Sequence, residues 1–263
     1  MKRAPIDLGA FDWILVNTSG GKDSMTALRL TVQAADEAGF PRARIVCVHA
    51  DLGEAEWAGA PELARLQAEH YGLRFERVER RQRDGSGDTM VDFAKRRGMW
   101  PSAANRWCTS EFKRTPCGRV ITMLDREVRR DRRQHVRILQ VFGYRAQESD
   151  RRFEFRSLDP CKRFSTKSRT VQNWHPIITW SLEEIWQDIH SHAVPHHRAY
   201  DLGMSRLSCV FCVLANQADL QVAAWHNPGL LRRYAQAEAE MGHDFQNRKP
   251  IGRLLDIGSE SCR

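Results

Sequence analysis

A short polar loop between an apolar run and an amphipathic run constrains this chain most strongly. Residues 19–24 read Ser-Gly-Gly-Lys-Asp-Ser; they follow the apolar residues 13–16 and precede the amphipathic residues 25–38. This order predicts a strand, a glycine turn and the N-terminus of a helix. Adjacent glycines let backbone N–H groups approach a phosphate, and the helix dipole favours negative charge there. The loop is therefore predicted to bind phosphate groups.

The side chains of this loop also suit a bound phosphate. Lys22 brings a positive charge, and the two serines bring hydroxyl donors. Asp23 is itself an anion, which predicts a Mg²⁺ ion that bridges its carboxylate to the phosphates. The motif is not a Walker A sequence, because Val16 stands where that motif needs a glycine. An ordinary glycine turn capped by serines is the alternative interpretation.

Strand-like and helix-like segments alternate along much of the chain, which favours a mostly parallel sheet covered on both faces. Expected strands span residues 13–17, 44–49, 74–78 and 136–142, with a short edge strand over 174–178; expected helices span 25–38, 61–71, 89–97, 118–130 and 181–191. We therefore expect a doubly wound α/β fold with a helical C-terminal part. The 263 residues would form a nucleotide-binding domain over 1–180 and a cysteine-bearing helical region over 181–263 packed on it.

The loop resembles the PP-loop of the ATP pyrophosphatases. Further segments resemble, in order, those of the phosphoadenosine-phosphosulfate reductase-like branch of that superfamily: Asp51-Leu52-Gly53, residues 106–113, residues 143–149 with Arg152, residues 174–186 and residues 200–212. Leu52 departs from the threonine that is usual at its position. The resemblance covers most of residues 11–215. Within that branch, the basic charge favours a resemblance to DndC-like enzymes, which help to place sulfur into the DNA backbone, over reductases of small sulfonucleotides.

The resemblance implies an enzyme that cleaves ATP to AMP and pyrophosphate, adenylates an acceptor oxygen and lets a sulfur nucleophile displace AMP. It implies that ATP contacts Ser19, Gly20, Gly21, Lys22, Asp23, Ser24, Asp51, Gly143 and Arg145. Lys22, Asp23, Lys113 and Arg145 are the candidates for catalysis, as charges acting on the phosphates and on Mg²⁺. The alternative roles are surface ion pairing for Lys113 and Arg145, and helix capping for Asp51.

Two of the seven cysteines form a C-x-x-C turn, Cys209 and Cys212. In a cytosolic enzyme this spacing is typical of a metal site, since two thiolates reach one metal from a tight turn. Cys108 lies in a segment where iron–sulfur relatives carry cysteines, so the resemblance implies a [4Fe–4S] cluster with Cys161 as the fourth ligand. Cys117 is the alternative fourth ligand. Zinc bound together with a histidine, and a plain reduced C-x-x-C, are the alternatives to a cluster.

Charge and hydropathy bear on partners and location. The formal net charge is +8, and arginines gather at residues 129–133. This favours a polyanionic partner such as DNA, with a solvated arginine-rich surface as the alternative. No apolar run of about 18 residues occurs, so no membrane span is expected, and no apolar segment follows the basic N-terminus, so a cytoplasmic protein is expected. A sulfur-donor protein such as a cysteine desulfurase is a further expected partner.

Three other functions stay open. The first is reduction of a sulfonucleotide (PAPS or APS), although the tail Glu260-Ser261-Cys262 departs from the Glu-Cys-Gly of such reductases. The second is a non-catalytic nucleotide sensor or DNA-binding subunit of a larger assembly. The third is ATP-dependent amidation or ligation without sulfur chemistry, which the C-x-x-C turn disfavours.

Overall fold

The computed structural model describes residues 6–131 and 135–258. Its sheet has the strand order β3-β2-β1-β4-β6-β5. The strands are β1 (Trp13–Asn17), β2 (Ile45–Asp51), β3 (Arg74–Glu79), β4 (Val136–Val141), β5 (Leu158–Pro160) and β6 (Arg169–Trp174). β1 pairs in parallel with β2 and β4, β4 pairs in parallel with β6, and β5 runs antiparallel to β6. The predicted mostly parallel sheet is confirmed.

The chain divides into two compact units, each made of separate segments. The sheet unit comprises Met1–Ala50, Gly59–Val78 and Cys117–His197. The helical unit comprises Asp51–Ala58, Glu79–Pro116 and Arg198–Arg263. This division differs from the boundary expected at residue 180, because the chain leaves the sheet twice after a strand and returns to it.

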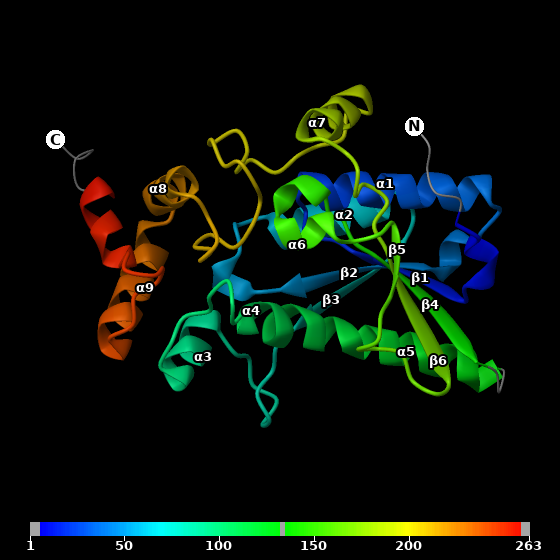
Figure 1. Cartoon of the computed structure of the whole chain (residues 1–263), viewed down its shortest axis with the longest axis horizontal. Helices are drawn as coiled ribbons and strands as arrows, with labels where there is room; N and C mark the ends of the chain where they lie inside the picture. Colours follow the sequence, from blue (N-terminus) through cyan, green and yellow to red (C-terminus); the bar gives the residue numbers. More distant parts are fainter. Residues whose placement is uncertain (1–5, 132–134, 259–263) are drawn as a thin grey trace. The chain divides into compact units, whose positions relative to one another are not determined.

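Helices cover both faces of the sheet, as the doubly wound prediction requires (Figure 1). α1 (Lys22–Glu37) and α2 (Ala60–His70) lie on one face, and α5 (Thr115–Asp131) lies on the other. Successive β1 residues alternate between the two cores: Ile14 packs in the core that includes α1, and Leu15 in the core that includes α5. Burial on both faces explains why β1 is a continuous apolar run.

α7 (Leu182–Ser191) belongs to the sheet unit. Its predicted capping box is present: Ser181 N donates to Glu184 Oε2 at 2.7 Å, and Glu184 N donates to Ser181 Oγ at 3.1 Å. Ile185 packs in a core cluster with residues of α1, and Arg29 Nε on α1 donates to Asp188 at 2.9 Å. These contacts place α7 with the sheet, although it lies beyond the expected boundary.

The strand predicted over residues 174–178 is wrong in position and in its edge location. β6 ends at Trp174 and lies between β4 and β5. Pro176 stands two residues after this end, and a proline has no N–H for a sheet ladder. The segment Arg169–Trp174 is polar, so its pairing with β4 could not be read from hydrophobicity.

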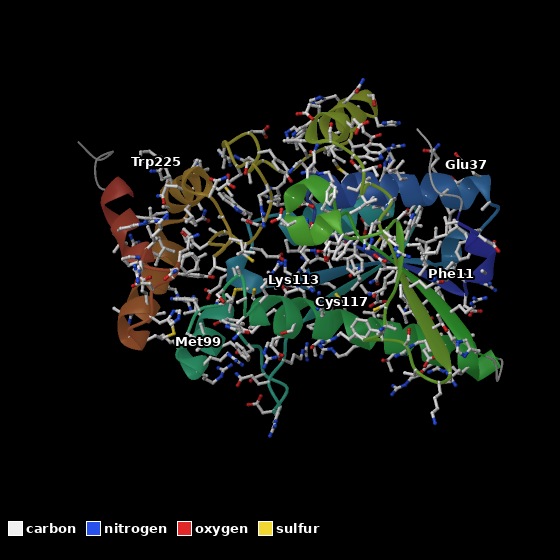
Figure 2. The ribbon with its side chains drawn as sticks, in the orientation of Figure 1. Phe11, Glu37, Met99, Lys113, Cys117 and Trp225 are labelled. Carbon is white, nitrogen blue, oxygen red and sulfur yellow. The ribbon has the colours of Figure 1, made fainter. Side chains whose placement is uncertain are left out.

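The helical unit has its own apolar core, which contains Trp100, Phe211 and Tyr234. Its helices are α3 (Met90–Arg97), α4 (Trp107–Thr109), a π-helical turn (Ser110–Arg114), α8 (Gln217–His226), α9 (Pro228–Met241) and a 3₁₀ segment (Ile251–Gly258). In this unit, the large apolar side chains of Met99, which follows α3, and of Trp225 on α8 remain partly exposed (Figure 2). The sheet unit also contains the short helix α6 (Asp150–Phe153) and 3₁₀ turns at Leu8–Ala10, Arg42–Arg44 and Ala146–Glu148. The helical unit contains a 3₁₀ turn at Gly53–Ala55.

Candidate functional site

The loop of residues 19–24 joins β1 to α1 in the sheet unit. Gly20 has a φ of +71°, and a Cβ built on it would lie 2.7 Å from the backbone oxygen of Ala60. Only glycine fits that position without strain. α1 begins directly after Gly21, so the positive end of the helix dipole faces the loop. The predicted strand, glycine turn and helix N-terminus are therefore all present.

The two serines hold the loop against the first turn of α1. Ser19 N donates to Ser24 Oγ at 3.2 Å, and the two hydroxyl oxygens are 3.1 Å apart. Ser24 Oγ also donates to Gly21 O at 2.9 Å. The hydroxyls thus shape the loop, and their contact with a phosphate stays a prediction.

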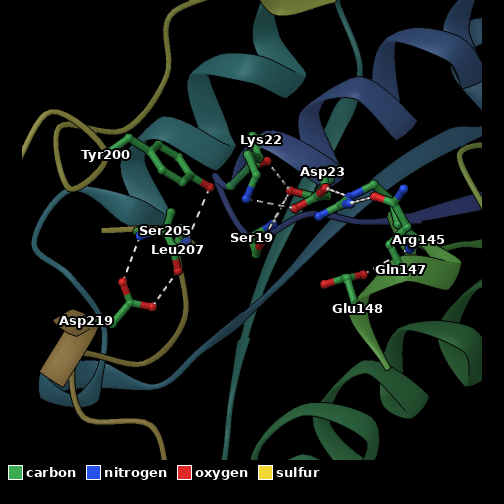
Figure 3. Close-up of polar contacts among 12 residues, drawn as sticks. Ser19, Lys22, Asp23, Arg145, Gln147, Glu148, Tyr200, Ser205, Leu207 and Asp219 are labelled. Atoms are coloured by element: carbon green, nitrogen blue, oxygen red, sulfur yellow. Dashed lines mark hydrogen bonds and ion pairs between the residues drawn. The ribbon is translucent and has the colours of Figure 1, made fainter. Parts of the chain in front are cut away.

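Asp23 lies between two cations in the sheet unit (Figure 3). Its Oδ1 accepts a 2.6 Å hydrogen bond from Arg145 Nε, and its Oδ2 is 3.4 Å from Lys22 Nζ. The Lys22 side chain is 2% exposed and that of Arg145 is 9% exposed. Burying charges is costly unless they are paired, and here Asp23 pairs with both cations. Three charged side chains therefore lie together at the N-terminus of α1.

The segment after β4 packs against the same loop. A Cβ built on Gly143 would lie 2.4 Å from Asp23 O and 2.7 Å from Ser24 N, so glycine lets the two backbones approach. The backbone N–H of Arg145 donates to Glu148 Oε2 at 2.9 Å. Glu148 also forms an ion pair with Arg152, so this carboxylate contacts both the backbone of Arg145 and the guanidinium of Arg152.

Asp51 ends β2 and is grouped with the helical unit. Its Oδ1 accepts a 2.8 Å hydrogen bond from the backbone N–H of Gly53, two residues ahead. This is an Asx turn, which fixes the start of the 3₁₀ turn at Gly53–Ala55. Contact of Asp51 with a nucleotide stays a prediction.

Three of the four predicted cluster ligands belong to the helical unit: Cys108, Cys209 and Cys212. Each is a partly buried free thiol, and Cys209 interacts electrostatically with both others. Among residues 6–131 and 135–258, no group of three or more His, Cys, Asp or Glu side chains is placed to hold a metal ion. A metal bound by these three thiols therefore stays a prediction.

Charged residues surround this thiol group in the helical unit. Desolvation raises the pKa of Cys209 to about 12, against the opposing effect of Lys113. Desolvation acts to lower the pKa of Lys113. The negative charges available to its neighbours have the larger combined effect, so the pKa of Lys113 is raised; these neighbours are Cys209, Glu56, Cys212 and Cys108. Lys113 precedes α5, which contains Cys117 (Figure 2). Lys113 therefore stays protonated at neutral pH next to the thiols.

Cys161 and Cys117 belong to the sheet unit, where both pack in the core cluster under α5. The Cys161 thiol donates to Gln140 Oε1 at a distance of 3.8 Å. Whether Cys161 or Cys117 supplies a fourth ligand stays a prediction. Cys262, in the tail compared above with that of sulfonucleotide reductases, lies outside the described residues.

The structure adds two residues to the thiol group that sequence reasoning missed. Glu56 forms a backbone bridge with Cys209, and the Tyr234 phenol interacts electrostatically with Cys209 and Cys212. Glu56 follows Gly53 closely in sequence and could have been noticed there. Tyr234 lies inside a regular helix, and no sequence signal singled it out.

Comparison with known proteins agrees with this architecture. The chain belongs to the phosphoadenosine phosphosulfate reductase domain family, whose model matches residues 13–215. An adenosine 5'-phosphosulfate reductase of Allochromatium vinosum is 27% identical over 185 residues, which is 65% of this chain and 63% of that protein. A phosphoadenylyl-sulfate (PAPS) reductase of Candida auris in a phosphate complex has the same fold, with a TM-score of 0.50 and 16% identity over 77% of this chain and 83% of that one.

A longer relative is an uncharacterised protein of Methanocaldococcus jannaschii. It is 24% identical over 238 residues, which is 85% of this chain but 42% of that protein. The chain thus spans about half the length of curated relatives such as this one. Among the helices that the structure describes, none combines the length and the apolar character needed to cross a membrane.

Proposed function

We propose that this chain is an ATP pyrophosphatase that adenylates an acceptor during sulfur transfer. The observation that carries the proposal is the triad of buried Lys22, half-buried Asp23 and buried Arg145 at a glycine loop before a helix. Family membership supports a nucleotide as the ligand. Position and charge together favour a triphosphate over an uncharged ligand, because two cations and a helix N-terminus face one loop.

The triad would exchange partners when ATP binds. Lys22 and Arg145 each contact one oxygen of Asp23, and the phosphates offer these cations a stronger anionic partner. Asp23 would then be available to hold Mg²⁺ through its carboxylate. Backbone N–H groups of Gly20 and Gly21 would hold the departing pyrophosphate, while Arg145 would act on the α-phosphate as its charge grows.

The thiol group of the helical unit suits an iron–sulfur cluster in its chemistry. Cys108, Cys209 and Cys212 are free, partly buried and close enough to interact electrostatically, and thiolates are the ligands that iron–sulfur clusters use. Cys161 stays the predicted fourth ligand. When bound, a [4Fe–4S] cluster would hold or relay the sulfur that displaces AMP. Lys113 would offset the negative charge of the thiolates.

The test is product analysis with ATP, Mg²⁺ and the purified protein. We expect AMP and pyrophosphate, and a loss of roughly 10²–10³-fold in turnover for Lys22→Ala, by analogy with loss of an oxyanion donor. The matched control is Lys95→Ala, which removes an exposed lysine of the helical unit. Lys95 pairs with Glu240 of the same unit. Release of ADP and phosphate would show that the proposed cleavage position is wrong.

Nucleic acid is the acceptor class that the charge favours. The formal net charge is +8, and phosphate contacts release counterions, so affinity for DNA or RNA should fall steeply as salt rises. An anisotropy titration with a labelled duplex at low and high salt measures this. Absence of binding at low salt would remove nucleic acid as a direct partner.

Sulfonucleotide reduction is the second candidate. The Allochromatium vinosum relative is a reductase of adenosine 5'-phosphosulfate, and it is matched over 65% of this chain. Incubation with thioredoxin, a reductant and either adenosine 5'-phosphosulfate or phosphoadenosine phosphosulfate would then yield sulfite. Sulfite formation without ATP cleavage would favour this function over the first.

A further inference from the structure

Most of the positive charge of this chain lies in two segments of the sheet unit. Residues 117–130 belong to α5, and residues 161–169 precede and begin β6. Together they carry eight Lys or Arg residues and two Asp or Glu residues, so their net charge is +6, against +8 for the whole chain. The positive charge is thus concentrated in residues other than those proposed to bind ATP.

The two segments pack against each other and form one surface. Arg129 Nη2 on α5 donates to Ser168 O at 2.8 Å, and Arg169 Nη1 is 3.4 Å from Asp125 Oδ2. α5 covers the face of the sheet opposite to α1, whose N-terminus forms part of the phosphate loop (Figure 1). The surface therefore lies on the other side of the sheet from α1.

Both acidic residues of these segments are already paired. Asp125 lies between Arg129 and Arg169, and Glu127 pairs with Arg74 at 3.0 Å. Five further cations, here called the α5 surface, are exposed and form no ion pair with any residue that the structure describes: Arg126, Arg130, Lys162, Arg163 and Lys167. Unpaired like charges that lie close together attract an anionic partner.

We propose that the α5 surface binds the phosphate backbone of a nucleic acid duplex. Arg126 and Arg130 are four residues apart, so both lie on the same side of α5. The other three cations come from the neighbouring segment. Cations spread over two segments suit an anion that repeats along a chain, and a duplex backbone offers closely spaced phosphates.

The aromatic content of the two segments favours a duplex over a single strand. Sites for single strands combine cations with aromatic rings on which the bases stack. Phe164 is the one aromatic residue in these segments. Its ring lies against α5, because a Cβ built on Gly118 would be 2.6 Å from Phe164 Cε1. Contacts of the α5 surface would therefore go to the backbone, which carries no sequence information directly.

The proposal rests on the nucleic-acid partner named under the proposed function and adds where that partner docks. A duplex on the α5 surface would be held on the side of the sheet opposite to α1, which leaves the triad of Lys22, Asp23 and Arg145 open to ATP. Holding the duplex on the protein raises the local concentration of acceptor groups. The α5 surface thus anchors the partner and takes no part in the cleavage of ATP.

The test is an anisotropy titration of the full chain with labelled DNA and RNA duplexes of one sequence, without ATP and at several salt concentrations. The surface variant combines Arg126→Gln, Arg130→Gln and Lys167→Gln. Its slope of log affinity against log salt should be shallower than that of wild type by roughly 2–3, because each lost phosphate contact removes about 0.9. Binding of either duplex supports the proposal, and the tighter one identifies the partner as DNA or RNA.

A matched control variant removes the same charge from other exposed positions of the sheet unit. It combines Arg44→Gln, Arg151→Gln and Arg156→Gln, and it should keep the slope of wild type. Equal changes of slope in the surface variant and the control would mean that net charge alone governs binding, and would overturn the proposal.

Two further variants keep the test decisive if the surface variant folds poorly. Arg126→Lys with Arg130→Lys preserves both charges and should keep the slope of wild type. Lys162→Gln with Arg163→Gln removes two charges from the neighbouring segment and should make the slope shallower by roughly 1–2. An unchanged slope in this second variant would overturn the proposal.

The remaining outcomes separate the docking surface from the proposed function. Wild-type protein that binds a duplex, with an unchanged slope in the surface variant, would overturn the α5 surface alone. Wild-type protein that binds no duplex at low salt would also remove the nucleic-acid partner. Tighter binding of a single strand of the same sequence would overturn the duplex assignment. ATP cleavage to AMP and pyrophosphate is measured without nucleic acid and would stand in each case.

Discussion

The guanidinium of Arg145 donates from its Nε to the carboxylate of Asp23 at 2.6 Å, although the two residues are 122 positions apart in the sequence. The same carboxylate is 3.4 Å from the ammonium of Lys22. A single acidic side chain thus holds two cations at the N-terminus of α1. This relationship links the glycine loop to the segment after β4, and it leads to the first two predictions.

Arg145→Ala should lower the rate of pyrophosphate release by roughly 10²–10³-fold, because a charge acting on the transition state is removed. Arg145→Lys should recover only part of the rate, since a lysine cannot reproduce the fork of the guanidinium. Arg151→Ala, at an exposed position on α6, is the control. A normal rate for Arg145→Ala would place this residue outside the reaction.

Gly143→Ala should impair ATP binding and destabilise the fold by about 1–3 kcal/mol. The added methyl would lie 2.4 Å from Asp23 O and 2.7 Å from Ser24 N, so the loop must move away from its position. Isothermal titration with ATP and urea unfolding measure the two effects. Gly87→Ala is the control, because a Cβ there meets nothing within 4 Å; an equal loss of affinity in both variants would argue against the contact.

Cys108→Ser, Cys209→Ser and Cys212→Ser should each lose most of the iron and the visible absorption of anaerobically purified protein, because thiolates hold iron–sulfur clusters. Cys47→Ser should keep both. Cys47 is a fully buried residue of β2, and burial raises the pKa of its thiol to about 12.

The same iron assay on Cys161→Ser decides the fourth ligand. Loss of iron would support Cys161 as the fourth thiolate. If iron is retained, Cys117 is the next candidate, and Cys117→Ser should then lose the iron. Colourless wild-type protein with one equivalent of zinc would show that the metal is zinc and contradict the iron–sulfur assignment.

Glu238→Ala should destabilise the helical unit by about 3 kcal/mol. The buried carboxylate accepts hydrogen bonds from the backbone N–H groups of Phe245 at 2.6 Å, Ile251 at 2.8 Å and Gly252 at 3.0 Å. Truncation leaves three donors to be satisfied in other ways. Chemical denaturation measures the change, with Gln236→Ala on the exposed side of the same helix as the control; equal effects would contradict this role.

Stability should fall as the pH drops below the ordinary histidine value of about 6.5. Burial lowers the pKa of His175, whose ring stacks on Phe155 at 5.2 Å and whose Nδ1 is 2.7 Å from Arg156 O. Because this pKa is lowered, the contribution of neutral His175 to the free energy of unfolding is complete above pH 6.5. This contribution is lost as the pH falls from about 6.5 through the folded-state pKa. Urea midpoints at several pH values should decline less in His175→Phe than in wild type; parallel curves would contradict the assignment.

The sequence by itself determined the local features of the phosphate loop. Ser19 to Ser24 carry their own turn and helix start, and the alternation of apolar strands with helices predicted the parallel sheet. These features depend on residues close together in the chain, where backbone sterics and periodicity act directly. The position of β6 was missed, because its polar residues form a strand only through pairing with β4.

Only the tertiary structure decided which distant groups meet. It joined Arg145 to Asp23, assigned Cys108 to the unit of Cys209 and Cys212 and Cys161 to the sheet unit, and brought Tyr234 against the C-x-x-C turn through Phe211. Such contacts depend on how buried surfaces pack and how the chain crosses between segments, and neither composition nor spacing encodes that locally. The physical reason is that a hydrogen bond or ion pair requires two groups within a few ångströms, whatever their separation along the chain.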